Sequence, residues 1–200
     1  MSSVGGGDMA VSYVIGNVVT DYGFNSEALI VQQNNCTARK IRKGSLAYSI
    51  AETLNFDPYA RRAARGNGIF PNLAKKEHRE KMGDVYVFDD GIKKARVACL
   101  FAQFRMGSAN SPFYLQSQIV DKEYKTTPDD KEARLRAFQQ CLEKLSSLID
   151  DRVRVIVFPE KIGCNMAGGD WPKYKAKIEQ FATLISKMKK NVSIIICKLQ

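Results

Sequence analysis

The chain has 200 residues, of which 44% are hydrophobic, and these values suit one domain with a sizeable core. They exclude a disordered or collagen-like protein, and no apolar run reaches the ~18–20 residues that a membrane-spanning helix needs. Lysine and arginine together number 31 and aspartate and glutamate 21, so the net charge of +10 predicts an anionic ligand or a polyanionic partner.

The five cysteines are widely spaced and none forms a Cys-x-x-Cys pair. An odd count without the spacing of zinc ligands predicts reduced thiols in an intracellular protein of the cytoplasm or nucleus. We expect neither a metal site nor a cofactor. Residues 1–10 lack the basic flank and apolar stretch of a signal peptide, so we expect a short flexible leader. The remaining residues, 11–200, are predicted to form a single domain.

In the first half of the chain, a strand is predicted over 11–19, with a turn at 20–23. Residues 28–31 form a continuous apolar run, which is typical of a strand buried on both faces. A polar and basic loop follows, and Ser45 is the predicted N-cap of a helix.

Residues 59–81 are predicted to form a long basic excursion on the surface, with one helical turn near 75–81. Strands are predicted over 84–88 and 96–101, and Asp89-Asp90-Gly91 between them indicates a hairpin turn.

A long loop over 105–127 then leads to a helix, which we predict to begin at Thr127 with Pro128 in its first position. The rest of the chain reads as a strand over 153–158, a glycine-rich loop over 162–170, an amphipathic helix and a strand over 192–197. Strands that alternate with helices predict parallel pairing. The predicted fold is therefore α/β, with a mixed and mainly parallel central sheet.

Two loops stand at predicted carboxyl ends of strands, where open α/β sheets bind their ligands. They are residues 32–45 and the glycine-rich loop 162–170. A glycine-rich loop between a strand and a helix exposes backbone N–H groups, which suit a phosphate. No Gly-Lys-Ser/Thr follows, so it is not a Walker loop. On spacing alone, a phosphate site and a structural turn remain alternatives.

Three segments resemble motifs of the macro domain family, whose members bind ADP-ribose. They are Gly16-Asn17-Val18-Val19-Thr20, Leu29-Ile30-Val31-Gln32-Gln33-Asn34-Asn35-Cys36, and Ile162-Gly163-Cys164-Asn165-Met166-Ala167-Gly168-Gly169-Asp170-Trp171. The resemblance implies a three-layer α/β/α macro-domain-like fold over 11–200. It also implies ADP-ribose, or an ADP-ribosylated molecule, as the ligand.

The same resemblance implies roles for single residues. Asn17 stands where the family has an aspartate that accepts from the adenine amino group, and Val18 would offer its backbone to the same ring. Asn35 matches an asparagine that hydrogen-bonds the distal ribose, although a strand-end cap is the alternative role. The diphosphate would be held by the second loop together with the end of the first; the residues concerned are Gly163, Cys164, Asn165, Met166, Ala167, Gly168, Gly169, Gly44 and Ser45.

This chain departs from the family pattern in both loops. The first loop is longer than in the family and keeps only Gly44. In the second loop Asn165 replaces a glycine, and an asparagine tolerates a left-handed backbone better than most residues. Ala167 stands where one glycohydrolase branch has an aspartate nucleophile, so that mechanism is not supported.

The resemblance implies hydrolysis of ADP-ribose 1″-phosphate or of protein-linked ADP-ribose, with water attacking a substrate that Asn35 holds. Asp170 is a second catalytic candidate, and a helix N-cap is its alternative role. A non-catalytic reader of ADP-ribose or poly(ADP-ribose) is the alternative function. His78 is expected at the surface, and Cys36 and Cys164 as small buried thiols.

Residues 37–81 hold 11 Lys/Arg and 4 Asp/Glu, so +7 of the net +10 lies there. One interpretation is a basic rim around an ADP-ribose pocket. The other is a surface for RNA or poly(ADP-ribose), since basic residues interleaved with aromatic ones bind single strands. The residues that would form that surface are Tyr59, Arg61, Arg62, Arg65 and Phe70. No membrane partner is expected.

Overall fold

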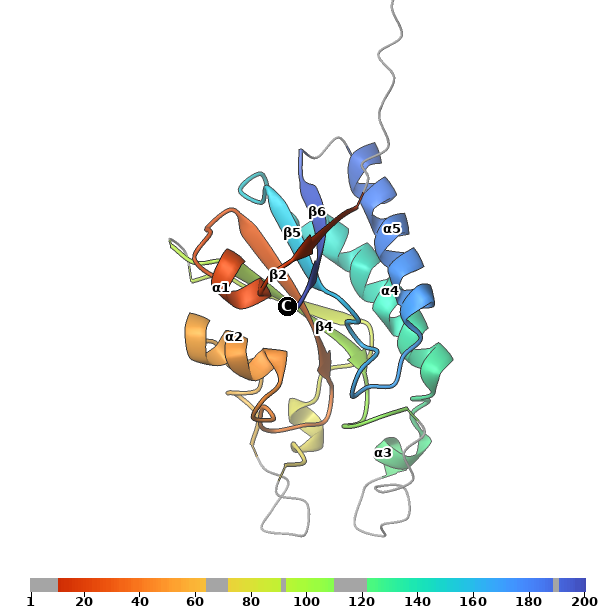
Figure 1. Cartoon of the computed structure of the whole chain (residues 1–200). Helices are drawn as coiled ribbons and strands as arrows, with labels where there is room; N and C mark the ends of the chain where they lie inside the picture. Colours follow the sequence, from red (N-terminus) through yellow and green to blue (C-terminus); the bar gives the residue numbers. More distant parts are fainter. Residues whose placement is uncertain (1–10, 64–71, 91–92, 110–121, 189–190) are drawn as a thin grey trace, which may run out of the picture.

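A mixed β-sheet runs through the centre of the molecule (Figure 1). The computed structural model describes residues 11–63, 72–90, 93–109, 122–188 and 191–200. Within them the strands are β1 (Ser12–Ile15), β2 (Ala28–Asn35), β3 (Asp84–Phe88), β4 (Arg96–Gln103), β5 (Val155–Pro159) and β6 (Ser193–Lys198). Their order across the sheet is β1-β6-β5-β2-β4-β3. The β3–β4 pair is antiparallel and the other neighbours are parallel, which confirms the predicted mixed, mainly parallel sheet.

Helices cover both faces of this sheet. On one face lie α1 (Val18–Tyr22) and α2 (Leu46–Leu54), and on the other lie α4 (Lys131–Leu148) and α5 (Trp171–Lys187) (Figure 1). Two shorter helices, α3 (Lys122–Thr126) and a 3₁₀ turn over Lys76–His78, belong to the connecting segments. The architecture is therefore the predicted three-layer α/β/α.

Strand β2 shows how the sheet joins the two helical layers. Leu29 and Val31 pack into the cluster with α4 and α5, whereas Ala28 and Ile30 pack into the cluster with α1 and α2. Successive side chains of a strand point to opposite faces, so a continuous apolar run fits a strand that is covered on both. Strand β2 is thereby packed on both faces, and a cavity opens at its carboxyl end.

The predicted strand over 11–19 and turn over 20–23 are wrong in part. The strand ends at Ile15 and helix α1 follows at once, because Asn17 caps it. Its side-chain oxygen accepts from the backbone N–H of Val19 at 2.9 Å and of Thr20 at 3.4 Å. Val18 is buried in the core, so local capping and burial outweigh the strand propensity of the valines.

The predicted start of α4 at Thr127 is also wrong. The helix begins at Lys131, because the carboxylate of Asp130 accepts from the backbone N–H of Ala133 at 2.8 Å and so acts as the N-cap. Asp129 therefore precedes the helix, and its side chain is buried. Part of the predicted loop 105–127 is the helix α3.

Other predicted elements fit with small shifts of boundary. The hairpin of β3 and β4 and the N-cap role of Ser45 are confirmed. Strand β2 continues four residues beyond its apolar run and pairs with β4 there, so its polar end belongs to the sheet.

The predicted leader 1–10 and Gly91 of the hairpin turn lie outside the described residues. Over the residues that are described, no helix is long and apolar enough to cross a membrane.

Candidate ligand pocket

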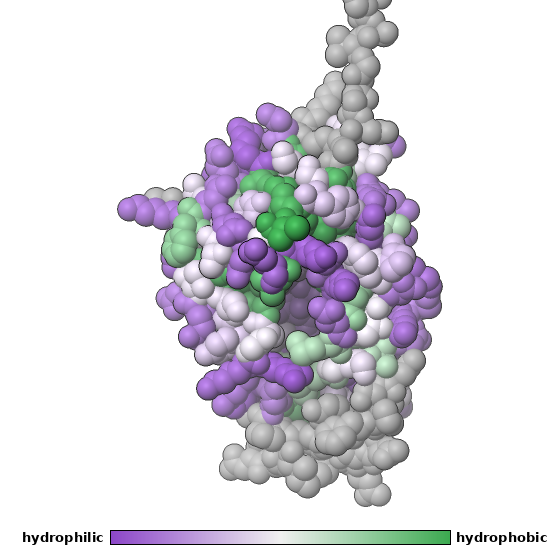
Figure 2. All heavy atoms as spheres, in the orientation of Figure 1, coloured by the Kyte–Doolittle hydropathy of each residue, from purple (hydrophilic) through white to green (hydrophobic). Residues whose placement is uncertain are grey.

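A cavity of about 640 Å³ opens where β2, β4 and β5 end. The loop that follows β2 and the loop between β5 and α5 form its sides. The space-filling view shows a hollow on this face with mostly hydrophilic side chains around it (Figure 2). Binding cavities for small molecules usually measure ~300–1,000 Å³, so the volume suits a nucleotide-sized ligand.

The structure brings many of the sequence-predicted site residues to this cavity. Those that line it are Asn35, Ser45, Gly163, Cys164, Asn165, Met166 and Ala167. The predicted residues that do not line it are Asn17, Val18, Gly44, Gly168, Gly169 and Asp170. Asp170 is exposed and occupies the N-cap position of α5, but its side chain makes no capping hydrogen bond.

The side chain of Asn35 holds the turn that follows β2. Its oxygen accepts from the backbone N–H of Thr37 at 3.2 Å and of Ala38 at 2.6 Å, and its amide nitrogen donates to the Tyr59 hydroxyl at 3.3 Å. The strand-end role is therefore present, while Asn35 still lines the cavity. Its contact with a ribose stays a prediction, as does the contact of Asn17 with an adenine.

Tyr59 and Arg62 support this turn from beneath, although the sequence analysis expected them on an exposed basic surface. The Tyr59 hydroxyl also accepts from the Asn34 side chain at 3.3 Å and from the Asn35 backbone at 3.2 Å, and burial raises the pKa of Tyr59 to about 12. The Arg62 guanidinium lies 4.3 Å from the centre of the Tyr59 ring, donates to the carbonyls of Asn35 and Ala38, and pairs with Glu80. Both residues are buried.

This burial corrects the predicted nucleic-acid surface for Tyr59 and Arg62, because neither the ring nor the guanidinium can reach a nucleic-acid strand in solvent. Of the other three members of that predicted surface, Arg61 is exposed, and Arg65 and Phe70 lie outside the described residues. His78 accepts from the backbone N–H of Ala63 at 2.9 Å through Nδ1, so it supports the same segment.

The loop between β5 and α5 presents consecutive backbone N–H groups. Three turn bonds hold it: Cys164 to Lys161 at 2.9 Å, Gly168 to Asn165 at 3.2 Å, and Gly169 to Gly163 at 3.0 Å, each from N–H to carbonyl. Within the described part of the chain, the N–H groups of Asn165, Met166 and Ala167 have no hydrogen-bond partner. Successive free N–H groups in a turn form a concave anion site.

Left-handed residues shape this loop, as expected, but Asn165 is not one of them. The positive φ angles belong to Lys161 at 59°, Gly163 at 70° and Gly168 at 71°. Gly163 has a further constraint, because a Cβ there would lie 2.4 Å from Oε1 of Gln33 and 2.6 Å from Cε1 of Tyr174. A glycine at this position is therefore required by both backbone and packing.

The charges around the cavity are mainly positive. Lys40, Arg42 and Lys161 line it, and Glu160 is the one carboxylate among the described lining residues. Arg42 reaches across the cavity, since its guanidinium lies 3.1 Å from the sulfur of Met166 in the other loop. Burial raises the pKa of the Cys164 thiol to about 12, which makes it a poor nucleophile at neutral pH.

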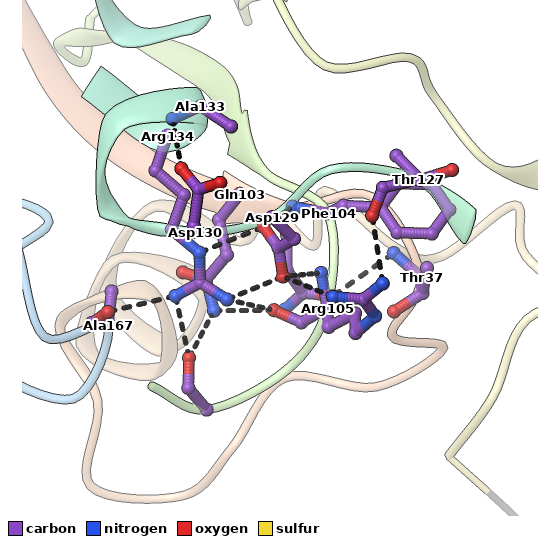
Figure 3. A network of polar contacts seen from close by, with 12 residues as sticks. Thr37, Gln103, Phe104, Arg105, Thr127, Asp129, Asp130, Ala133, Arg134 and Ala167 are labelled. Carbon is purple, nitrogen blue, oxygen red and sulfur yellow. Dashed lines mark hydrogen bonds and ion pairs between the residues drawn. The ribbon is translucent and has the colours of Figure 1, made fainter. Parts of the chain in front are cut away.

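A buried ion pair beneath the pocket was missed by the sequence analysis. Arg134 on α4 donates to the carboxylate of Asp129 at 2.8 and 2.6 Å, and both side chains are 1% exposed. Arg134 also donates to the carbonyl of Gly107 at 2.8 Å and of Ala167 at 2.9 Å (Figure 3). The pair therefore fixes the second loop from below. The only sequence signal for this pair was an arginine five residues after Asp129.

Within the described residues, no cluster of His, Cys, Asp and Glu has the arrangement of a metal site. The pocket thus offers amides, backbone N–H groups and basic side chains, which bind anions and hydroxyl groups.

Similar proteins were found through structure and not through sequence. No protein-family model and no curated protein matches the chain. The fold is similar to that of alphavirus P23pro-zbd, with 12% identity over 94% of this chain and a TM-score of 0.51; this chain spans 22% of that one. An Oceanobacillus iheyensis macrodomain with MES bound matches at 12% identity, over 94% of this chain and 82% of its own, with a TM-score of 0.47. A Trypanosoma brucei macrodomain matches at 11% identity, over 92% of this chain and 61% of its own, with a TM-score of 0.47. Such similarities concern the fold alone, and the chain has the three-layer α/β/α architecture expected from its macro-domain-like motifs.

Proposed function

We propose that the pocket binds ADP-ribose or an ADP-ribosylated molecule, with its diphosphate held by the loop after β5. One observation supports this most directly. Three consecutive backbone N–H groups, those of Asn165, Met166 and Ala167, have no hydrogen-bond partner among the described residues and stand at a cavity. A diphosphate is a ligand that satisfies several N–H groups at once.

The surrounding charge supports the same ligand. Lys40, Arg42 and Lys161 attract a diphosphate, and a single carboxylate, Glu160, opposes them among the described lining residues. Asn35 lines the other side of the cavity, where the resemblance to macro domains implies the distal ribose. The positive charge of the chain then belongs in part to a basic rim around this site.

Hydrolysis of an ADP-ribose derivative is the finer part of the proposal. Water would attack the distal ribose of a substrate that Asn35 orients, while the loop amides stabilise the diphosphate charge. Glu160 is the carboxylate among the described lining residues that could accept a proton, and assistance by the substrate is the alternative. The alternative function is a reader, which binds the same ligand without turnover.

Calorimetric titration with ADP-ribose tests the binding. The informative variant is Met166→Glu, because it places a carboxylate on an exposed residue beside the free N–H groups. The matched control is Met166→Gln, which has the same size without the charge. We expect a loss of about tenfold or more in affinity for the glutamate variant and less than about threefold for the glutamine variant. Failure of the parent protein to bind ADP-ribose would reject the proposal.

Turnover is tested separately on a protein that binds. Incubation with ADP-ribose 1″-phosphate should release phosphate, or incubation with mono-ADP-ribosylated protein should release ADP-ribose. If the parent releases one of these products and Asn35→Ala does not, the result supports the hydrolase. Tight binding with neither product establishes the reader.

A further inference from the structure

Ser45 places a hydroxyl at the cavity, directly after an exposed basic segment. It is the N-cap of α2, it lines the cavity, and it is half-buried as a residue. Its Oγ donates to the Arg42 carbonyl at 2.7 Å, in an exposed hydrogen bond, and accepts from the backbone N–H of Tyr48 at 3.2 Å. The hydroxyl is therefore shielded only by the first turn of a helix and by the loop before it.

The segment before Ser45 has a charge pattern that protein kinases recognise. Arg42 lies three residues before the serine, Lys43 lies two residues before it, and the apolar Leu46 follows it. Arg42 and Lys43 are exposed, as is Gly44, where an added Cβ would meet nothing within 4 Å. Within the described residues neither cation forms an ion pair. Kinases that act on basic segments select such a pattern through complementary acidic residues in their substrate groove.

The first turn of α2 can open while the rest of the helix stays packed. No residue from Leu46 to Ser49 is buried, and the buried residues of the helix are Ile50 and Leu54. Residues 39–45 belong to no helix and no strand. Segments with few buried contacts open locally at a small cost in free energy. The basic segment and Ser45 can therefore enter the groove of a kinase in an extended form.

Ser108 shows that the spacing alone does not make a kinase site. It is exposed and also follows an arginine, Arg105, by three residues. Arg105 is buried, however, and its guanidinium donates to the carbonyls of Tyr124 and Thr127 at 2.8 Å. A kinase cannot bind a guanidinium that the core already holds. We therefore expect modification at Ser45 and not at Ser108.

We propose that Ser45 is a phosphorylation site and that its phosphate lowers the affinity of the pocket for its ligand. A serine kinase would transfer the γ-phosphoryl group of ATP to Ser45. The bond between Oγ and the γ-phosphorus forms, the bond from that phosphorus to the β,γ-bridging oxygen breaks, ADP leaves, and the hydroxyl proton passes to the base of the kinase. The effect on affinity rests on the proposed function, whereas the modification does not.

The phosphate would compete with the diphosphate of the ligand for the same cations. It carries a charge of about −1.5 to −2 at pH 7, and the N-terminus of α2 stabilises an anion at this position. Ser45 lines the same cavity as Lys40 and Arg42, the cations that we propose to attract the diphosphate. A second anion in this cavity meets both charge repulsion and fewer free cations.

Mass spectrometry tests the modification. The parent is incubated with ATP, Mg²⁺ and the catalytic subunit of cyclic-AMP-dependent protein kinase, and we expect a phosphate that maps to Ser45. Arg42→Gln should slow the transfer to Ser45 about tenfold or more, because it removes the cation three residues before the serine. Ser108→Ala is the matched control and should be phosphorylated at the rate of the parent. Absence of phosphate at Ser45, or equal rates for Arg42→Gln and the parent, would overturn the proposed site.

Titration with ADP-ribose tests the effect on affinity. Ser45→Asp and Ser45→Asn separate charge from shape, because both side chains are good N-caps of nearly equal size. The aspartate variant should bind about tenfold or more weakly than the asparagine variant, and the phosphorylated parent should lose at least as much relative to the untreated parent. Equal affinities within either pair would overturn the effect. If the untreated parent binds no ADP-ribose, the proposed function is rejected instead, and the mapped phosphate still decides the modification.

Discussion

Asp129 and Arg134 form a buried ion pair in which two guanidinium nitrogens meet both carboxylate oxygens, at 2.8 and 2.6 Å. The carboxylate also accepts from the backbone N–H of Phe104 at 2.8 Å and of Arg105 at 2.9 Å. Because Arg134 donates onward to the carbonyls of Gly107 and Ala167, the pair connects the end of β4, the start of α4 and the loop after β5. Figure 3 shows these contacts converging on Asp129 and Arg134. The loop that we propose to hold the diphosphate is therefore supported by the core of the protein.

Asp129→Asn should destabilise the protein by about 3–5 kcal/mol, because it leaves the Arg134 guanidinium buried without its counter-charge. Urea unfolding followed by circular dichroism measures the loss. The neighbouring Asp130→Ala is the matched control: it removes only the N-cap of α4 and should cost about 1 kcal/mol. Equal losses in the two variants would contradict the role assigned to the ion pair.

Gly163→Ala should cost more stability than Gly44→Ala, although both glycines are left-handed, with φ of 70° and 74°. Each alanine incurs the backbone penalty of about 1–2 kcal/mol. At Gly44 nothing lies within 4 Å of the added Cβ, whereas at Gly163 it meets Gln33 and Tyr174. We therefore expect an additional loss of about 1–3 kcal/mol at Gly163, measured by thermal unfolding, together with weaker ADP-ribose binding. A similar loss at both positions would show that the loop relaxes freely.

Periodic apolar patterns predicted much of this fold, because burial on one or both faces leaves a trace in the sequence. The run over 28–31 and the hairpin strands 84–88 and 96–101 are examples. The patterns failed where one side chain decides the outcome: Asn17 starts a helix inside a valine-rich stretch, and Asp130 delays α4.

The candidate site was predictable only in part, for the same reason. The motif Ile162–Asp170 marked the second loop, of which residues 162–167 line the cavity and 168–170 do not. Composition placed Arg62 in a basic stretch, and nothing local indicated that Tyr59, Glu80 and two carbonyls would enclose it. Such long-range pairing depends on the tertiary fold and leaves no periodic signal.

Tyr59 should make stability depend on pH in the alkaline range. Burial raises its pKa from 10.0 to about 12, so the folded state keeps the proton that the unfolded state loses. The contribution of the protonated Tyr59 to the free energy of unfolding is therefore complete below pH 10. It is lost as the pH rises towards 12, by about 2–3 kcal/mol. The difference in unfolding free energy between the parent and Tyr59→Phe should therefore shrink over that range.

The exposed Tyr86 provides the control, since Tyr86→Phe should follow the curve of the parent. A constant difference between the parent and Tyr59→Phe from pH 10 to 12 would contradict a buried, protonated phenol beneath Asn34 and Asn35.

Arg42 should contribute to ligand affinity more than its neighbour Lys43. Only Arg42 lines the cavity, and its guanidinium already reaches Met166 in the opposite loop at 3.1 Å. A thioether is a weak acceptor, so an entering diphosphate would replace it as the partner of this cation. Arg42→Ala should weaken ADP-ribose binding about three- to tenfold and flatten its dependence on salt, because one screened charge contact is lost. Lys43→Ala, with the same change in net charge, should stay within about twofold of the parent. Titrations at low and high salt distinguish the two residues, and equal effects would mean that the net charge of the chain, and not the pocket, attracts the ligand.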